Sequence, residues 1–330
     1  MNLQEKLNKF SINDNSNHDE ENVGFIERYF NQNLIIKKVE ETGKYKDSQN
    51  MVKKIIYISI LIIIIFSSNI IFYFKNNDKY VNLYIVAHKD FTKKITNTHY
   101  KIACDNKEQL KDKYALEIIE TYQDNELYFK KRGYGEGSKI YYIWKKYQSR
   151  NISSQYVGFN HYSRIFPFRN HIPNLNKIFN ENDAIVNRIH KKKLTIRESF
   201  GNDHFENFLD ECIEIIKDKY PEYYPTALKT LNKYEMSYCN IFIMKEEDFI
   251  KYGEFVFGIL LEFDKRHNLI NDDDIKSFIS SEIDRLGKKN YNLDYQSRQE
   301  GFILERISNI FYNYHFKKMY EIYVPKKLIK

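Results

Sequence analysis

Hydrophobic positions fall into short continuous runs separated by stretches in which apolar residues recur every three or four positions. Continuous runs at 81–87, 100–104, 156–159, 183–187 and 238–244 predict strands. Stretches at 107–122, 138–147, 205–216, 249–263 and 295–314 predict helices. Because these strands and helices alternate from residue 81 onward, the pattern predicts an α/β fold.

A longer apolar stretch precedes these elements. Residues 55–74 contain no charged side chain, and a helix of that length spans about 30 Å, the thickness of a bilayer's hydrocarbon core. The stretch predicts a transmembrane anchor at 51–75, too long and too far from residue 1 for a cleaved signal peptide. It divides a polar tail at 1–50, predicted to be disordered, from a domain at 76–330.

The lysines that flank the anchor are nearly balanced, so they indicate its orientation only weakly. We favour a single-pass arrangement with the short tail in the cytosol and the large domain, C-terminal to the anchor, across the membrane. In a eukaryote this would be the Golgi or an equivalent endomembrane.

Charge separates the two parts further. The net charge is +7, but residues 1–54 hold nine basic and nine acidic side chains, so the excess lies in the predicted domain. A basic domain suits an anionic ligand such as a nucleotide diphosphate, and it equally suits solubility alone. No zinc-finger, helix-turn-helix or RNA-binding signature accompanies the charge, so nucleic acid is not an expected partner. Three scattered cysteines exclude a disulfide framework or a zinc site, and two of them, Cys212 and Cys239, are predicted core residues.

Polar side chains follow two of the predicted strands. The run at 156–159 ends in Asn160, His161, Tyr162, Ser163 and Arg164, and the run at 81–87 ends in His88, Lys89 and Asp90. An open α/β sheet usually keeps its site at such strand ends. The alternative is an ordinary polar loop.

Three other motifs invite a chemical interpretation. The glycines of R-G-Y-G-E-G-S at 132–138 predict a flexible loop at a helix N-terminus, which could hold phosphate or be a plain turn. The N-D-D-D run at 271–274 does not follow a buried strand, and we interpret it as a solvated loop or helix cap rather than a metal-binding Asp-X-Asp. Arg298, Phe302 and Glu305 share a helical face, with Gly301 leaving a gap that could admit a sugar or phosphate. Arg298 and Glu305 could equally form a structural ion pair.

Several blocks, in order, resemble the bacterial domain-of-unknown-function 4422 family over residues 81 to about 316. They are L-Y-I-V-A-H-K at 83–89, E-G-S-K-I-Y-Y-I-W-K at 136–145, Y-V-G-F-N-H-Y-S-R at 156–164, His204, C-N-I-F-I-M at 239–244 and R-Q-E-G-F-I-L-E-R at 298–306. This family occurs in capsular and exopolysaccharide gene clusters and is regarded as glycosyltransferase-like. Ser163 departs from the arginine usual at its position, which puts donor specificity in question.

The resemblance implies a GT-A-like mixed sheet flanked by helices, and a hexosyltransferase that moves a sugar from a nucleotide-sugar donor to a glycan hydroxyl. The predicted anchor is an addition to the family domain and would make this a membrane-anchored enzyme. Because inversion needs a group that takes the acceptor proton, the candidate catalytic residues are His161 at the strand tip and Glu305 or Glu136 as the base. The implied donor-binding residues are His88, Lys89, Tyr162, Arg164, His204, Asn240 and Arg298. No metal ligands are visible, so the cofactor stays unknown, although a divalent cation such as Mn²⁺ is compatible with the fold. The alternatives are a membrane-tethered glycan-binding or scaffolding module without turnover, and sugar-phosphate transfer.

Overall fold

The computed structural model divides the chain into two compact units, Met1–Phe74 and Lys75–Lys330. It describes residues 53, 55–60, 62, 80–91, 95, 97–110, 116–122, 124–168 and 173–325. The predicted tail and most of the predicted anchor lie outside these residues. Within the described part of the chain, no helix has the length and apolar character needed to cross a bilayer. The anchor therefore stays a prediction from the sequence.

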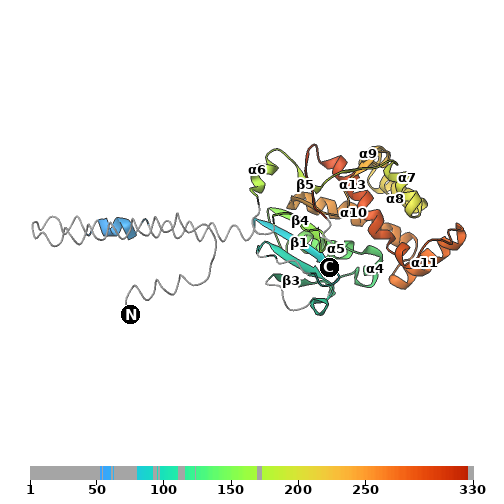
Figure 1. The fold of residues 1–330 in the computed structure, drawn as a ribbon, viewed down its shortest axis with the longest axis horizontal. Coiled ribbons are helices and arrows are strands. Elements are labelled where there is room, and N and C mark those ends of the chain that lie inside the picture. The colour runs from blue at the N-terminus through green and yellow to red at the C-terminus, as the bar shows by residue number, and fades with distance from the viewer. Residues whose placement is uncertain are drawn as a thin grey trace, which may run out of the picture. The chain divides into compact units, whose positions relative to one another are not determined.

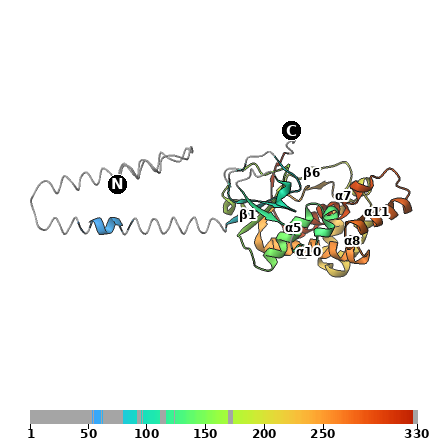
Figure 2. The same cartoon turned by 90° about the horizontal axis from the view of Figure 1, so that it is seen from below.

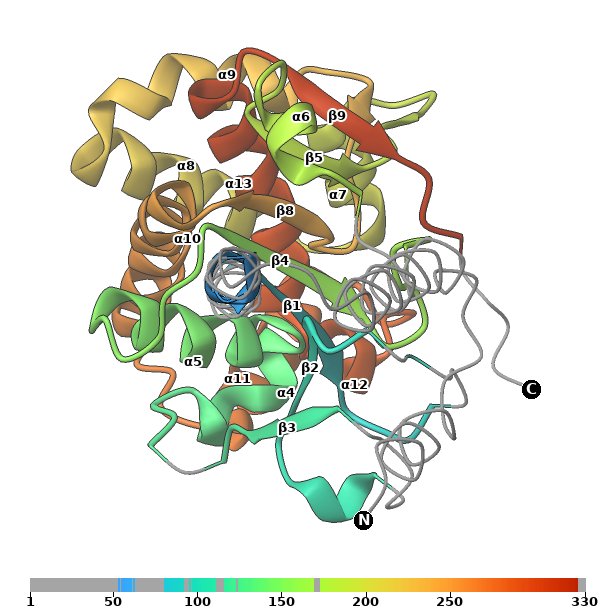
Figure 3. The same ribbon diagram turned by 90° about the vertical axis from the view of Figure 1, so that its left-hand side faces the viewer.

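A seven-stranded mixed sheet forms the centre of the second unit, in the order β3-β2-β1-β4-β8-β5-β9 (Figure 3). The strands are β1 Val81–Ala87, β2 Tyr100–Cys104, β3 Glu117–Glu120, β4 Tyr156–His161, β5 Ala184–Asn187, β8 Phe242–Lys245 and β9 Met319–Ile322. All neighbours pair in parallel except β8, which is antiparallel to both β4 and β5. A separate ribbon pairs β6 His190–Lys191 with β7 Glu235–Met236.

Both faces of the sheet are covered, as β1 shows. All seven of its residues are buried. Because successive side chains point to opposite faces, Leu83 and Ile85 belong to one apolar cluster, whereas Tyr84 and Val86 belong to the other. Burial on both faces explains why this strand reads as a continuous apolar run.

Helices pack on each face of the sheet. The helices are α4 Lys131–Tyr134, α5 Gly137–Gln148, α6 Leu175–Phe179, α7 Ile196–Asp203, α8 Glu206–Lys219, α9 Tyr224–Leu231, α10 Glu246–Arg266, α11 Asp272–Arg285, α12 Leu293–Gln296 and α13 Gln299–His315. Helices α5, α10 and α13 pack in the larger cluster, and α6 packs in the smaller one. Helices α8 and α11 lie on the side of the unit away from the start of β1 (Figures 1 and 2).

The predicted helix at 107–122 is wrong. Of its residues that the structure describes, 107–110 and 116–122, Lys107–Gln109 form a single 3₁₀ turn and Glu117–Glu120 form β3, a third parallel strand beside β2. An ion pair of 2.9 Å between Lys101 and Glu117 joins the two strands. The β-branched side chains of Ile118 and Ile119 favour a strand. The sequence pattern was misread as helical because so short a segment does not show that it pairs with β2.

Two further boundaries differ from prediction. The strand expected at 238–244 begins only at Phe242, because Cys239 and Asn240 take positive φ values of 73° and 45°. Cys239 is accordingly in a turn and only partly buried. The acidic run at 271–274 is a helix cap, which was one of the two interpretations. The Asn271 side chain accepts from the Asp274 backbone N–H, and the Asp274 carboxylate accepts from the Asn271 backbone N–H.

Contact between α5 and α10 depends on the absence of a side chain at Gly253. A Cβ atom there would lie 2.1 Å from the Trp144 ring, whose Nε1 donates to the Ile250 carbonyl at 3.0 Å. We therefore expect Gly253→Ala to lower the free energy of unfolding by about 1–3 kcal/mol through overpacking. Chemical denaturation of the full chain measures this.

Gly201→Ala is the control, since Gly201 also lies within a helix, α7, and gains the same helical propensity. A Cβ atom there would meet first the carboxylate end of Glu206, an exposed and flexible side chain that can move aside. Equal stability of the two variants would contradict the packing argument.

Candidate functional site

Strand order places a topological switch point between β1 and β4. The chain passes from β1 to β2 on one side, and β4 pairs with β1 on the other. In open α/β sheets, ligands bind beyond the carboxyl ends of the strands at such a point. The two strands deliver His88 and His161 there, with ring centroids 6.2 Å apart. The rings of Tyr162 and His88 form a T-shaped pair with centroids 4.6 Å apart, and the Lys89 ammonium lies 5.5 Å from the Tyr162 ring centroid.

A tight turn holds the end of β4 in place. The backbone N–H of Arg164 donates to the His161 carbonyl at 2.8 Å, which reverses the chain. Asn160, 1% exposed, accepts from the Phe166 backbone at 2.9 Å. Asn160 is therefore a structural residue that pins the loop, and His161 is left half-buried at the strand tip.

Both ring nitrogens of His161 have partners. Nδ1 accepts from the Ser163 backbone N–H at 3.1 Å and lies 2.5 Å from the Ser163 hydroxyl. With Nδ1 as the acceptor, the proton of the neutral imidazole lies on Nε2, which is 3.0 Å from a Glu136 carboxylate oxygen. His161 thus orients the carboxyl group of Glu136.

The glycine segment brings Glu136 to this position. Gly135 has a φ of 55°, which turns the chain between α4 and α5, and Glu136 immediately precedes α5. A Cβ at Gly301 would lie 3.2 Å from the Tyr134 carbonyl. The segment is therefore packed against α13, and the expectation of a flexible loop is corrected. The gap at Gly301 is filled by this backbone, not left open for a ligand.

Three positively charged side chains lie close enough to His88 to affect its titration. Lys139, one turn along α5, forms a 2.6 Å ion pair with Asp105, and both side chains are less than a tenth exposed. The pKa of His88 is lowered, first by loss of ring solvation and then by the charges of Lys139, Lys89 and Arg298. His88 is therefore neutral near pH 7, in a region of positive potential. Such a region attracts an anion.

Glu136 has an unusual titration. Burial, and next the negative charge of Glu305, raise its pKa to about 8, although Arg298, Arg164 and Lys139 act in the opposite direction. A carboxyl group with this pKa exchanges its proton close to neutral pH, where general acid–base catalysis is most efficient. Because Glu305, Arg298 and Arg164 all influence the pKa of Glu136, their charged groups lie near the switch point.

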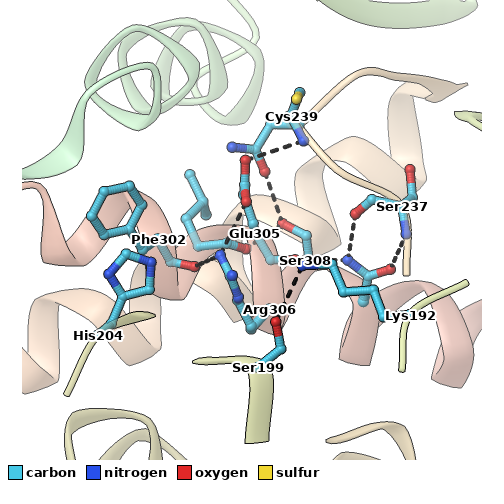
Figure 4. Close-up of polar contacts among 12 residues, drawn as sticks. Lys192, Ser199, His204, Ser237, Cys239, Phe302, Glu305, Arg306 and Ser308 are labelled. Carbon is cyan, nitrogen blue, oxygen red and sulfur yellow. Dashed lines mark hydrogen bonds and ion pairs between the residues drawn. The ribbon is translucent and has the colours of Figure 1, made fainter. Parts of the chain in front are cut away.

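Glu305 is held by two donors (Figure 4). One of its oxygens accepts from the Cys239 backbone N–H at 3.1 Å, and the other from Arg306 Nη1 at 3.0 Å. The ion pair considered between Arg298 and Glu305 is therefore replaced by one between Glu305 and Arg306. The left-handed backbone at Cys239 and Asn240 presents the N–H to the carboxylate, and the Asn240 side chain accepts from Ser308 at 3.4 Å.

His204 is packed into the core beside α13. It is 3% exposed and follows α7 rather than opening a helix. Its ring stacks on Phe302 with ring centroids 4.0 Å apart (Figure 4). Its Nδ1 is 3.1 Å from the Gln296 side-chain oxygen. Burial lowers its pKa to about 4. This environment fits a neutral core histidine, and the predicted donor contact receives no geometric support.

Sequence reasoning missed three polar residues at the site. They are Lys139, Asp105 and Ser163, the last having been noted at the strand tip and as a departure from the family pattern but given no role. Lys139 follows Glu136 by three positions, so the two share a helical face, and this signal was available. Asp105 follows β2 directly, but its pairing with Lys139 depends on packing between α5 and the sheet.

Comparison with known proteins identifies the family and the fold. A family model described as a domain of unknown function, DUF4422, matches residues 82–283, more than half of the chain. The apo structure of the bifunctional glycosyltransferase WbbM aligns with a TM-score of 0.51 and 19% identity, over 74% of this chain and 44% of that one. At this identity the likeness establishes a shared fold, and the chain spans less than half of WbbM.

A second solved structure, the mannosyltransferase Ktr4p from S. cerevisiae, aligns with a TM-score of 0.28 and 10% identity, over 54% of this chain and 60% of that one. No curated protein matches the sequence. The family match confirms the resemblance found in the sequence: the chain belongs to the family described as domain of unknown function 4422.

Proposed function

We propose that this chain is a glycosyltransferase of GT-A type that moves a hexose from a nucleotide-sugar donor to a glycan hydroxyl. One observation carries the proposal. At the switch point of the sheet, a carboxyl group whose pKa is raised to about 8 is bound by a histidine and lies within the field of several cations. The same point holds a base and a site for negative charge, the two requirements of this reaction. The fold shared with WbbM supports the assignment.

In this reaction the bond between the sugar and the nucleoside diphosphate breaks, and a new glycosidic bond forms to the acceptor oxygen. Glu136 takes the acceptor's proton, and His161 holds it in position. Lys89, Arg164 and Arg298 stabilise the charge that develops on the departing diphosphate. Lys139 is neutralised by Asp105 and supports the Glu136 end of α5.

Turnover of a nucleotide sugar tests the proposal. The full chain is incubated with UDP-, GDP- and dTDP-hexoses, with Mn²⁺ and with EDTA, and release of free nucleotide is measured. We expect turnover of at least one donor, and about a 10²-fold loss in His161→Ala, because misplacement of a catalytic group by about 1 Å has that cost.

Circular dichroism verifies that the variant is folded. Absence of nucleotide release with every donor, together with retained glycan binding, would overturn the enzyme assignment in favour of a glycan-binding module.

A further inference from the structure

A polar pocket opens at the edge of the sheet that carries the switch point, beyond β5 and β9. It has a volume of about 510 Å³ and is lined by Arg188, His190, Lys191, Glu235, Glu321 and Tyr323. Arg188 follows the end of β5, and Tyr323 follows the end of β9. Because β5 and β9 run parallel to β1 and β4, all four strands release their following residues on one side.

Backbone hydrogen bonds hold the walls of this pocket. The Arg188 N–H donates to the Ile322 carbonyl at 2.9 Å, and the Ile189 N–H donates to the Glu321 carboxylate at 3.0 Å. On the opposite wall, Lys191 and Glu235 are opposite each other in the antiparallel backbone pairing of β6 with β7. The pocket is thus formed before any ligand arrives, and its volume is that of a small-molecule site.

The chemistry of the lining favours a neutral, polyhydroxylated ligand. The positive charges of Arg188 and Lys191 are balanced by the negative charges of Glu235 and Glu321. The lining of the pocket therefore has no excess positive charge to attract an anion. The guanidinium and carboxylates offer paired donors and acceptors suited to vicinal hydroxyls. Tyr323, 60% exposed, supplies an aromatic surface with a polar tip on which a sugar ring can pack.

A continuous set of residues joins this pocket to the switch point. Only β8 separates β4 from β5, so two strand spacings, roughly 10 Å, divide their ends. The turn before β8 fills that interval: the Tyr238 carbonyl accepts from Asn187 at 3.3 Å, and its ring lies 6.0 Å from His190. The next residue, Cys239, donates to Glu305 (Figure 4).

We propose that the pocket is an acceptor subsite, which binds a neutral hexose unit of the glycan a short way along the chain from the hydroxyl that reacts beside Glu136. This rests on the proposed glycosyl transfer. A glycan bound here crosses the Tyr238–Asn240 turn, and its reactive end reaches the switch point. The pocket selects the acceptor, and the residues at β1 and β4 select the donor.

The test uses the double variant Arg188→Ala/Tyr323→Ala in the full chain, with Tyr320→Ala as its matched control. Tyr320 is an exposed tyrosine of β9 that does not line the pocket. Saturation-transfer NMR is recorded with maltohexaose, laminarihexaose and a β-linked galactohexaose, and with hexagalacturonate as an anionic comparison. We expect at least one neutral hexamer to give a signal that the double variant loses and the control keeps.

Nucleotide-sugar hydrolysis, in which water replaces the acceptor, is measured on the same proteins. We expect unchanged kcat and KM for hydrolysis in the double variant, and an acceptor KM raised at least about tenfold for transfer to the bound hexamer. Binding of no neutral hexamer, binding of hexagalacturonate alone, or equal binding by the double variant would overturn the subsite. Oligosaccharide binding at this pocket without any hydrolysis by the wild type would instead reject the proposed function.

Discussion

We expect Glu136→Gln to lower kcat for glycosyl transfer by about 10²–10⁴-fold, the usual contribution of a general base. Glutamine keeps the shape and the hydrogen bond to His161 but cannot accept a proton. The measurement is the rate of transfer at saturating donor, as a function of pH. In the wild type the rate should rise as pH increases through about 8, because only the ionised carboxylate acts as a base and burial raises its pKa to that value. The variant should lose this rise.

Two comparisons separate this effect from a general loss of function. Glu222→Gln changes an exposed glutamate on the surface and should leave rate and pH profile unaltered. Glu305→Gln removes the negative charge that raises the pKa of Glu136, so the rise in rate should move to lower pH. A Glu136→Gln enzyme that keeps the wild-type rate and profile would show that the base lies elsewhere.

Replacement of Arg298 by alanine has the second large effect. We expect a loss of about 10–10²-fold in kcat/KM for the nucleotide sugar, since a hydrogen bond to a charged group contributes roughly 1.5–3 kcal/mol. Arg298 is exposed at the start of α13 and its charge acts on both His88 and Glu136. Its positive charge lowers the pKa of Glu136, so the rise in rate should move to higher pH in Arg298→Ala, opposite to Glu305→Gln.

Arg298→Lys distinguishes charge from geometry. Lysine keeps the charge and should keep the pH profile, but it lacks the planar fork that binds two phosphate oxygens, so kcat/KM should still fall. Lys229→Ala, a change at an exposed lysine on α9, is the control for a loss of net positive charge. An unchanged kcat/KM in Arg298→Ala would exclude a donor contact at this residue.

The elements best predicted from the sequence are those with a strong local signal. The strand at 81–87 was recognised because burial on both faces leaves a continuous run of apolar residues. The helix predicted at 249–263 was recognised because burial on one face repeats apolar residues with a period of 3.6. The cap at Asn271 was among the interpretations offered because its pattern is local. The strand at 117–120 was missed because it is defined by its pairing with β2, and this pairing leaves no local pattern in the sequence.

The candidate site divides in the same way. His88 and His161 were identified because each ends an apolar run, and the structure brings their rings within 6.2 Å. His204 was offered only through the family resemblance, and packing buries it against Phe302. A histidine beside a helix has the same local signature whether its ring faces solvent or the core, so the sequence pattern could not separate the two cases.

By itself, the sequence determined which segments are strands and helices of strong period, and which of them end in polar side chains. Only the tertiary structure decided that Glu136 meets His161, that Glu305 pairs with Arg306 rather than Arg298, and that the gap at Gly301 is filled by the glycine segment. The reason is physical: periodicity and capping depend on neighbours within a few residues, whereas these contacts depend on close packing between elements far apart in the chain.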